Sequence, residues 1–252
     1  MTLTLCRADA LLERPAGVIF DTDNTLYPYD SCHAQAMEAT RRKAVRVLGI
    51  SEQQFDAAFA EAKQQIKGRL EGTASSHSRL LYFQRMLELM GLRTQVLMAL
   101  DFEQTYWRSF LTSSQLFDQV KDFLDDLRLS GTPTAIITDL TAQIQFRKIV
   151  YWELDHYFDH VVTSEEAGFD KPHSAPFNLA KEKFGDIGHP LWMIGDNPIC
   201  DIQAARLCLG AITLQKKHKG VTIMEGDMQP DVIFENFSEL RTLFSGLPGR
   251  AS

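Results

Sequence analysis

The chain has 252 residues, of which 44% are hydrophobic and 23% are charged, and its formal net charge at pH 7 is −7. A chain of this length and composition can bury one large core or two modest ones. Its acidic balance provides no overall field that would attract nucleic acid or an anionic membrane, so we expect neither as a partner.

The cysteines and the N-terminal segment indicate the compartment. The four cysteines show no CxxC spacing and are too few for a disulfide scaffold in a chain of this length. No apolar run approaches the roughly 18 residues of a membrane span. Residues 1–14 carry Arg7, Asp9 and Glu13 and lack the apolar stretch of a signal peptide. These features predict reduced thiols and a cytoplasmic location.

Short apolar runs recur along the chain and are typical of buried strands. The runs are residues 17–20, 133–138, 160–163, 191–194, 211–214 and, more weakly, 231–234. Helix-like stretches precede or separate the later runs, namely residues 117–129, 141–152 and 174–183. Strands that alternate with helices predict an α/β fold in which helices cover both faces of a parallel sheet.

Residues 28–113 differ from the rest of the chain because they contain no convincing strand. Two groups of apolar side chains recur there at helical spacing. The groups are Phe55, Ala58, Phe59, Ala62 and Ile66, followed by Leu80, Phe83, Met86, Leu87 and Met90. We therefore expect an all-helical domain over residues 28–113, inserted into a discontinuous core formed by residues 1–27 and 114–252.

Residues with chemical potential follow the predicted strands. In an open parallel sheet, ligands bind beyond the carboxyl ends of the strands. The residues are Asp21 and Asp23 after the first strand, Thr138 and Asp139 at the end of the second, Lys171 after the third, and Asp196 and Asp201 after the fourth. Each alone has an ordinary explanation, such as a turn, a helix cap or a solvated loop lysine. Together they aim carboxylates, a hydroxyl and an ammonium at one edge of the sheet.

This combination of groups suits a metal ion and a phosphoryl group. Clustered carboxylates repel one another unless a cation binds among them. Mg²⁺ prefers oxygen ligands, which Asp21, Asp196 and a backbone carbonyl at Asp23 could supply. Phosphoryl transfer also needs groups that hold the equatorial phosphoryl oxygens, and Thr138 and Lys171 are suited to this.

The motifs resemble, in order, the four signature motifs of the haloacid dehalogenase-like hydrolase superfamily. The matching segments are residues 18–27, 135–139, 169–173 and 194–201. The resemblance covers nearly the whole chain. It implies a Rossmann-like, doubly wound parallel core with an inserted all-helical cap of the C1 type.

The resemblance implies hydrolysis of a phosphate ester through a covalent intermediate. Asp21 would attack phosphorus and form an aspartyl-phosphate. Asp23 would protonate the leaving oxygen and then act as a base toward the hydrolytic water. Dehalogenases that resemble this fold lack the second aspartate and use no Mg²⁺, so the presence of Asp23 argues against dehalogenation.

The remaining motif residues would hold the phosphoryl group and the metal. Thr138 and Lys171 would bind phosphoryl oxygens. Asp196 would bind Mg²⁺, and Asp201 would bind it directly or stand beside it. Asp139 is a departure, because many relatives carry asparagine there. Its carboxylate could weaken anion binding, although its backbone N–H remains available for a substrate oxygen.

Substrate identity is less visible in the sequence. The polar segment 73–79 lies between two predicted cap helices, and a C1 cap can present such a linker to the site. His77 and Arg79 are therefore candidates for contacting the leaving group. The same segment could instead be a solvated turn with Ser76 or Ser78 as a helix cap. We expect a small phosphorylated metabolite, either a sugar phosphate or a nucleoside monophosphate; oligomeric state is not readable.

Other functions remain open on the same fold. A phosphomutase uses the same two aspartates. Phosphonate hydrolysis needs a cap lysine, for which Lys43, Lys63 or Lys67 would have to serve. A non-catalytic protein could bind a phosphorylated ligand. The complete set of motif residues favours an enzyme, and hydrolysis is the commoner outcome by analogy with the superfamily.

Overall fold

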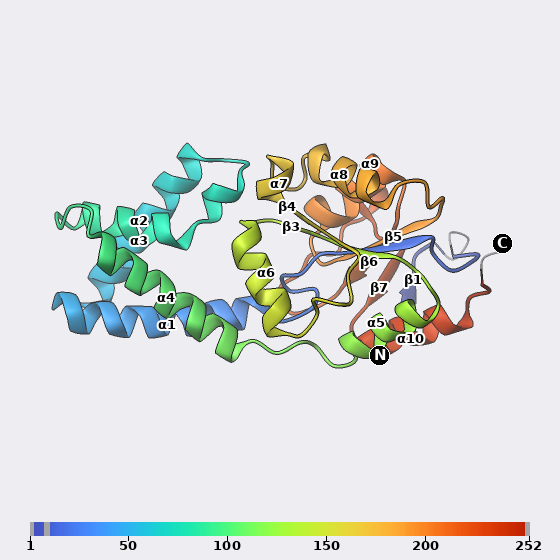
Figure 1. Ribbon diagram of the computed structural model, residues 1–252, viewed down its shortest axis with the longest axis horizontal. Coiled ribbons are helices and arrows are strands. Elements are labelled where there is room, and N and C mark those ends of the chain that lie inside the picture. Colours follow the sequence, from blue (N-terminus) through green and yellow to red (C-terminus); the bar gives the residue numbers. More distant parts are fainter. Residues whose placement is uncertain (1–2, 8–10, 250–252) are drawn as a thin grey trace. The chain divides into compact units, whose positions relative to one another are not determined.

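The computed structural model describes residues 3–7 and 11–249. The chain divides into two compact units, of which one takes the described residues up to Pro28 and from Gln115 onward, and the other is Tyr29–Ser114. The first unit carries a sheet covered by helices, and the second is built from helices (Figure 1).

The helical unit contains four long helices, all within described residues. They are α1 (Tyr29–Leu48), α2 (Glu52–Arg69), α3 (Arg79–Leu89) and α4 (Val96–Ser113), with a 3-10 turn at Ala74–His77. The predicted helical spacing is confirmed, since α2 buries Phe55, Phe59 and Ile66 along one face. Their partner is the buried ring of Phe83 on α3, whose centroid lies 5.3 Å from that of Phe59.

Within the described residues, the other unit has a seven-stranded sheet in the order β1-β7-β6-β5-β2-β3-β4. The strands are β1 (Thr4–Leu5), β2 (Gly17–Phe20), β3 (Thr134–Thr138), β4 (His160–Thr163), β5 (Leu191–Gly195), β6 (Ile212–Lys216) and β7 (Val232–Phe234). The six predicted strands are confirmed, with boundaries that differ by at most two residues. β1 was not predicted, because a two-residue strand leaves no periodic pattern; it pairs antiparallel with β7, whereas the other pairs are parallel.

The strand order reverses at β2. The next strands along the chain, β3 and β4, lie on one side of β2, and β5 then pairs with β2 on its other side. Phe20, the last residue of β2, stands opposite Ile136 of β3 and Ile194 of β5. The carboxyl ends of these three strands therefore lie side by side, and this switch point is where ligands bind in open α/β sheets.

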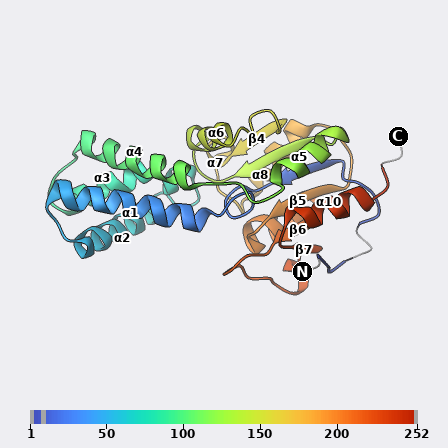
Figure 2. The same ribbon diagram turned by 90° about the horizontal axis from the view of Figure 1, so that it is seen from below.

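Helices cover both faces of the sheet, as the doubly wound prediction requires. On one face α8 (Ser174–Phe184) and α9 (Ala204–Leu209) bury the side chains of Ile19 and Met193. On the other face α5 (Val120–Leu129) and α10 (Phe237–Gly246) lie side by side (Figure 2). There the ring of Phe20 meets that of Phe123. Neighbouring strand residues thus point to opposite layers.

Two helix boundaries differ from the prediction for a local reason. The helix predicted over 117–129 begins at Val120, because Gln119 adopts a left-handed conformation with φ 64° that cannot continue a helix. The helix predicted over 141–152 is α6 (Ala142–Tyr151), which starts after Thr141 in an extended conformation. The helices of the described residues include none with an apolar stretch that could span a lipid bilayer.

Candidate active site

Lys171 connects two of the predicted carboxylates at the switch point. Its Nζ donates to Asp21 Oδ1 at 2.7 Å and to Asp201 Oδ1 at 2.6 Å. All three side chains are buried. Burial alone would lower the pKa of Lys171, but Asp201, Asp21 and Asp139 raise it well above its ordinary value. The lysine is thus held as a cation within an acidic cluster.

Asp196 completes that cluster. Asp21, Asp196 and Asp201 each offer a carboxylate oxygen, and these oxygens lie within 4.8 Å of one another. Burial and the neighbouring carboxylates raise the pKa of Asp21 to about 7 and that of Asp196 to about 8, although Lys171 opposes both shifts. Clustered, mutually repelling carboxylates, two of them buried and Asp196 half-buried, fit a hard divalent cation, which would relieve the repulsion. The carboxylate of Asp23 is not in this group; the ligand expected from Asp23 is its backbone carbonyl.

A glycine and a capped turn bring Asp201 to the end of β5. A Cβ on Gly195 would stand 2.5 Å from Asp201 Cβ, so only glycine leaves room for the Asp201 side chain. After β5, Asn197 caps the π-helical segment Pro198–Gln203 by accepting the N–H groups of Ile199 and Cys200. The N–H of Asn197 itself donates to Asp201 Oδ2 at 3.0 Å.

Asp23 lies beside this cluster with its own set of donors. Lys148 Nζ is 2.9 Å from Asp23 Oδ1, Tyr27 Oη is 2.5 Å from it and Thr22 Oγ1 is 3.2 Å from it. Burial would raise the pKa of Asp23, but Lys148 and the Tyr27 and Thr22 hydroxyls together lower it. The pKa values of two neighbouring aspartates are thus shifted in opposite directions, that of Asp21 upward and that of Asp23 downward.

The end of β3 contributes a hydroxyl and a strained turn. Thr138 Oγ1 lies 2.8 Å from Thr22 Oγ1, so the structure brings Thr138 to the loop after β2. Asp139 Oδ1 accepts the backbone N–H of Lys171 at 2.9 Å. Leu140 follows with φ 92°, a region that favours glycine. The Ser164 hydroxyl accepts the N–H of Leu140 at 2.9 Å and holds this turn.

The two cap candidates lie in the helical unit. The Arg79 guanidinium sits over the ring of Tyr106, with a carbon-to-centroid distance of 5.2 Å, and also contacts Tyr82 and Trp107. Arg79 donates to the His77 carbonyl at 2.6 Å and to the Tyr29 hydroxyl. Arg79 is 9% exposed, and His77 is half-buried. Contact of either residue with a substrate stays a prediction.

Ser78 in the same segment caps a helix, which is one of the two roles that the sequence predicts for this segment. Its hydroxyl accepts the N–H of Leu81 at 3.3 Å at the start of α3. Ser76, the other candidate cap, is buried in the 3-10 turn before it. The polar character of residues 73–79 is thus explained in part by local backbone hydrogen bonding.

Three residues at the site escaped the sequence interpretation. Gln145 and Lys148 reach it from α6, where Gln145 Nε2 donates to Thr138 Oγ1 at 2.8 Å. Both occupy the buried face of α6 together with Ile144 and Ile149. A polar residue at a position that helical spacing assigns to the buried face is the sequence feature that could have indicated them. His218, in the loop after β6, places Nε2 3.0 Å from Asp196 Oδ2.

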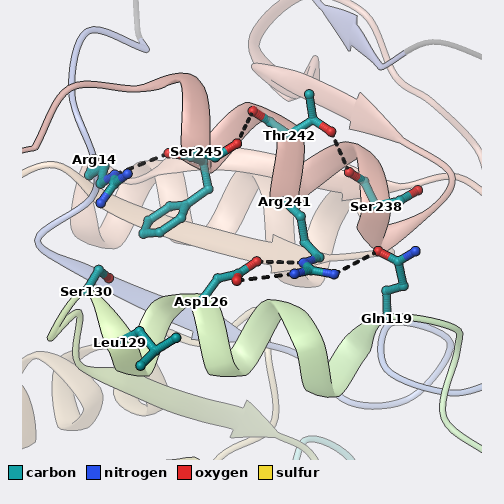
Figure 3. A pocket seen from close by; sticks show the side chains of 10 residues that line it. Arg14, Gln119, Asp126, Leu129, Ser130, Ser238, Arg241, Thr242 and Ser245 are labelled. Atoms are coloured by element: carbon teal, nitrogen blue, oxygen red, sulfur yellow. Dashed lines mark hydrogen bonds and ion pairs between the residues drawn. The ribbon is translucent and has the colours of Figure 1, made fainter.

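A separate hollow of about 510 Å³ lies between α5 and α10 (Figure 3). Its lining contains none of the motif residues. Its charged side chains are engaged within the lining: Arg241 Nε is 2.6 Å from Asp126 Oδ2, and Arg14 Nε donates to the Phe244 carbonyl at 3.2 Å. The hollow is therefore a feature of the packing between two helices rather than part of the acidic site.

Comparison with known proteins identifies the family of the chain. Residues 15–208 match the model of a family described as haloacid dehalogenase-like hydrolase. The chain is 36% identical over 191 residues to a ribulose-1,5-bisphosphate 5-phosphatase of Halopiger xanaduensis, a match that covers 75% of this chain and 80% of the relative. It is 26% identical over 216 residues to a glyceraldehyde 3-phosphate phosphatase of Methanopyrus kandleri, covering 86% and 90% of the two chains.

Solved structures share the fold at lower identity. A HAD phosphatase from Thermococcus onnurineus superposes with a TM-score of 0.68 and 23% identity over 92% of this chain and 98% of that chain. A 2-haloacid dehalogenase from Pseudomonas syringae pv. Tomato gives a TM-score of 0.70 with 20% identity over 90% and 97%. Phosphatases and a dehalogenase thus share this architecture, so the reaction has to be argued from the site.

Proposed function

Because the chain belongs to the haloacid dehalogenase-like hydrolase family and is a phosphoric monoester hydrolase, we propose that it hydrolyses a small phosphorylated metabolite through an aspartyl-phosphate on Asp21, with Mg²⁺ as its cofactor. The observation that carries the proposal is the buried cluster in which Lys171 bridges Asp21 and Asp201 beside Asp196. A lysine and three carboxylates at a sheet switch point suit a phosphate ester that binds with a divalent cation.

The roles follow from where the side chains lie. Asp21 is proposed as the nucleophile, with Lys171 holding its Oδ1 so that the other oxygen can approach phosphorus in line. Thr138 and Lys171 would bind the phosphoryl oxygens as the P–O bond breaks. Bound Mg²⁺ would neutralise the charge of the carboxylates and of the phosphoryl oxygens. Its ligands would be Asp21, Asp196, the backbone carbonyl of Asp23, and Asp201 directly or through a neighbour.

Asp23 is proposed as the group that moves protons. It would give a proton to the leaving oxygen and later take one from the water that attacks the aspartyl-phosphate. Its side chain is 37% exposed, in contrast to the 9% of Asp21. The greater exposure supports a carboxyl that faces a leaving group and water.

The substrate proposed is a sugar phosphate, because the relatives named above act on ribulose-1,5-bisphosphate and on glyceraldehyde 3-phosphate. His77 and Arg79 are proposed to contact the leaving group. The partners of Arg79 described above are a carbonyl, a phenol and aromatic rings, none of which is an anion at neutral pH. Its positive charge is therefore suited to attracting an anionic substrate.

A cytoplasmic location belongs to the same proposal. The four cysteines, all of them in described residues, form no disulfide. Free thiols are typical of a reducing compartment, where small phosphorylated metabolites are turned over.

The test is release of inorganic phosphate from a panel of sugar phosphates and nucleoside monophosphates, with Mg²⁺ or with EDTA. We expect Mg²⁺-dependent release that falls about 1,000-fold or more in Asp21→Asn, since that variant loses its nucleophile. Asp186→Asn is the matched control, because Asp186 is an exposed loop residue. Full activity in Asp21→Asn would refute the mechanism, and an isomeric phosphate ester formed without free phosphate would identify a mutase.

A further inference from the structure

We infer that Lys148 is a positioning residue that holds Asp23 by Oδ1 and so leaves Oδ2 as the oxygen that exchanges protons. The inference rests on the proposed function, since it concerns how the proposed acid/base residue is aimed. Lys148 lies outside the four motifs, on the helix that follows β3. Its role would be to orient a carboxyl group and not to touch the substrate.

Lys148 is buried and lies within hydrogen-bonding distance of Asp23. The side chain of Lys148 is 1% exposed, and its Nζ stands 2.9 Å from Asp23 Oδ1. A lysine is seldom buried to this degree without a charged partner, because removing the ammonium from water is expensive. The ion pair connects residues 125 positions apart in sequence, so it ties α6 to the loop after β2.

The three donors to the Asp23 side chain all bind the same carboxylate oxygen. Lys148, Tyr27 and Thr22 all donate to Oδ1 of Asp23, at 2.9, 2.5 and 3.2 Å. Three donors occupy the acceptor capacity of one carboxylate oxygen. Oδ2 receives none of these three bonds, although 37% of the side chain is exposed. The carboxylate is therefore fixed in rotation, with one oxygen committed to the protein.

The direction of Lys148 is itself fixed by packing. Its Nζ lies 5.5 Å from the centroid of the Tyr27 ring, a distance at which a cation is attracted to the ring face. That ring is fully buried and lies 4.3 Å, centroid to centroid, from Trp152 at the end of α6. Lys148 and Tyr27 thus support each other as they hold Asp23, which is how a rigid second layer keeps a reactive group aimed.

A misplaced Asp23 carboxyl should affect the two esters below to different extents, whereas a general loss of structure should affect both equally. Departure of phenolate, a basic leaving group, depends more on a well-placed acid than departure of p-nitrophenolate, which is a stable anion. The second-order rate constant kcat/KM reports the steps through cleavage of the ester bond. The ratio of kcat/KM for phenyl phosphate to kcat/KM for p-nitrophenyl phosphate therefore measures the contribution of the acid.

The test compares this ratio in the full chain and its variants with Mg²⁺. In Lys148→Met we expect kcat/KM for phenyl phosphate to fall about 100-fold and that for p-nitrophenyl phosphate about tenfold, so that the ratio falls about tenfold. Lys148→Arg keeps a cation and should restore the ratio to within about threefold of wild type. Lys121→Met is the matched control, since Lys121 pairs with Glu153 at the surface of the same unit.

Tyr27→Phe removes a second donor to Asp23 Oδ1 and should also lower the ratio. This variant tests the inference if circular dichroism shows that Lys148→Met does not fold. Equal losses for both esters in the folded Lys148 variant, or an unchanged ratio in Tyr27→Phe, would overturn the inference and leave the proposed function intact. A wild-type protein that releases phosphate from neither aryl ester nor from any sugar phosphate or nucleoside monophosphate of the panel would instead contradict the proposed function itself.

Discussion

Gly195 and Asp201 approach so closely that a Cβ on Gly195 would stand 2.5 Å from the Cβ, Cγ and Oδ2 of Asp201. Real Cβ atoms do not come this near to such atoms. The absence of a side chain at the end of β5 therefore lets the Asp201 carboxylate reach Lys171, to which it is bonded at 2.6 Å.

Gly195→Ala should displace Asp201 and open the acidic cluster. We expect Mg²⁺ affinity and kcat/KM each to fall about 10- to 100-fold, in the range found when residues that support a metal site are changed. Isothermal titration with Mg²⁺ and phosphate release measure the two effects. Gly246→Ala is the matched control, because a Cβ there meets nothing within 4 Å, and it should leave both values unchanged. Equal behaviour of the two variants would contradict the steric argument.

The raised pKa values of Asp21 and Asp196 predict how Mg²⁺ stabilises the protein as a function of pH. Metal-free folded protein keeps these protons up to about pH 7 and 8, whereas the unfolded chain releases them near the ordinary value of 3.8. Their contribution to stability is thus complete below about pH 4 and is lost as pH rises through 7 and 8. Mg²⁺ binds the ionised carboxylates, so the gain in Tm on adding Mg²⁺ should grow from pH 5 to pH 8.5.

Differential scanning fluorimetry with Mg²⁺ or EDTA across this range measures that gain. Asp196→Asn removes one of the two raised groups and a ligand, and should abolish most of the gain. A gain in Tm that is the same at pH 5 and pH 8.5 in the unaltered protein would speak against a carboxylate site of this kind.

Asp139 should tolerate asparagine but not alanine. Its Oδ1 accepts the Lys171 N–H at 2.9 Å, and an asparagine oxygen can accept the same bond without a negative charge. In Asp139→Asn we expect inorganic phosphate to inhibit about three- to tenfold more tightly, since one like charge is removed from the site. Asp139→Ala leaves the N–H unpaired, which costs about 1–3 kcal/mol. Inhibition constants and Tm values of the two variants distinguish the outcomes, and identical values would reject the anchoring role.

His33 in the helical unit provides a prediction that is independent of the acidic site. Burial and the positive charges of Arg79 and Lys63 lower its pKa to about 4. In the unfolded chain His33 becomes charged below about 6.5, so its contribution to stability is present above that pH and is lost as pH falls through about 4. In Arg79→Met the pKa of His33 should rise, because one repelling charge is gone.

Histidine titration by NMR measures this change. Arg85→Met, on the same helix α3, is the control, because Arg85 pairs with Glu88 and is not among the groups that shift His33. The prediction fails if both variants leave the His33 midpoint at the same value.

Much of the architecture could be predicted because it depends on local patterns. The apolar runs located six strands, and helical spacing located the inserted helices. The residues that follow β2, β3 and β5 could be grouped in advance, because parallel strands end at one edge of a sheet. The structure brings Asp21, Lys171 and Asp201 into direct contact there.

Other features depend on contacts between distant segments and left no local signal. The two residues of β1 form a strand only because β7 offers an edge, and α5 starts late because of the backbone at Gln119. Lys148 resembles any lysine of an amphipathic helix until the fold buries it against Asp23.

The sequence by itself determined which chemical groups stand at the ends of the strands, because strand order along the chain and the alternation of side chains are local properties. Only the tertiary structure decided what those groups do to one another. The pKa of Asp21 rises because burial and the nearby carboxylates of Asp201 and Asp23 outweigh Lys171, whereas that of Asp23 falls because Lys148 and two hydroxyl groups outweigh burial, and each effect depends on distances of a few ångströms. Such distances arise when segments more than a hundred residues apart pack together, and no local pattern encodes them.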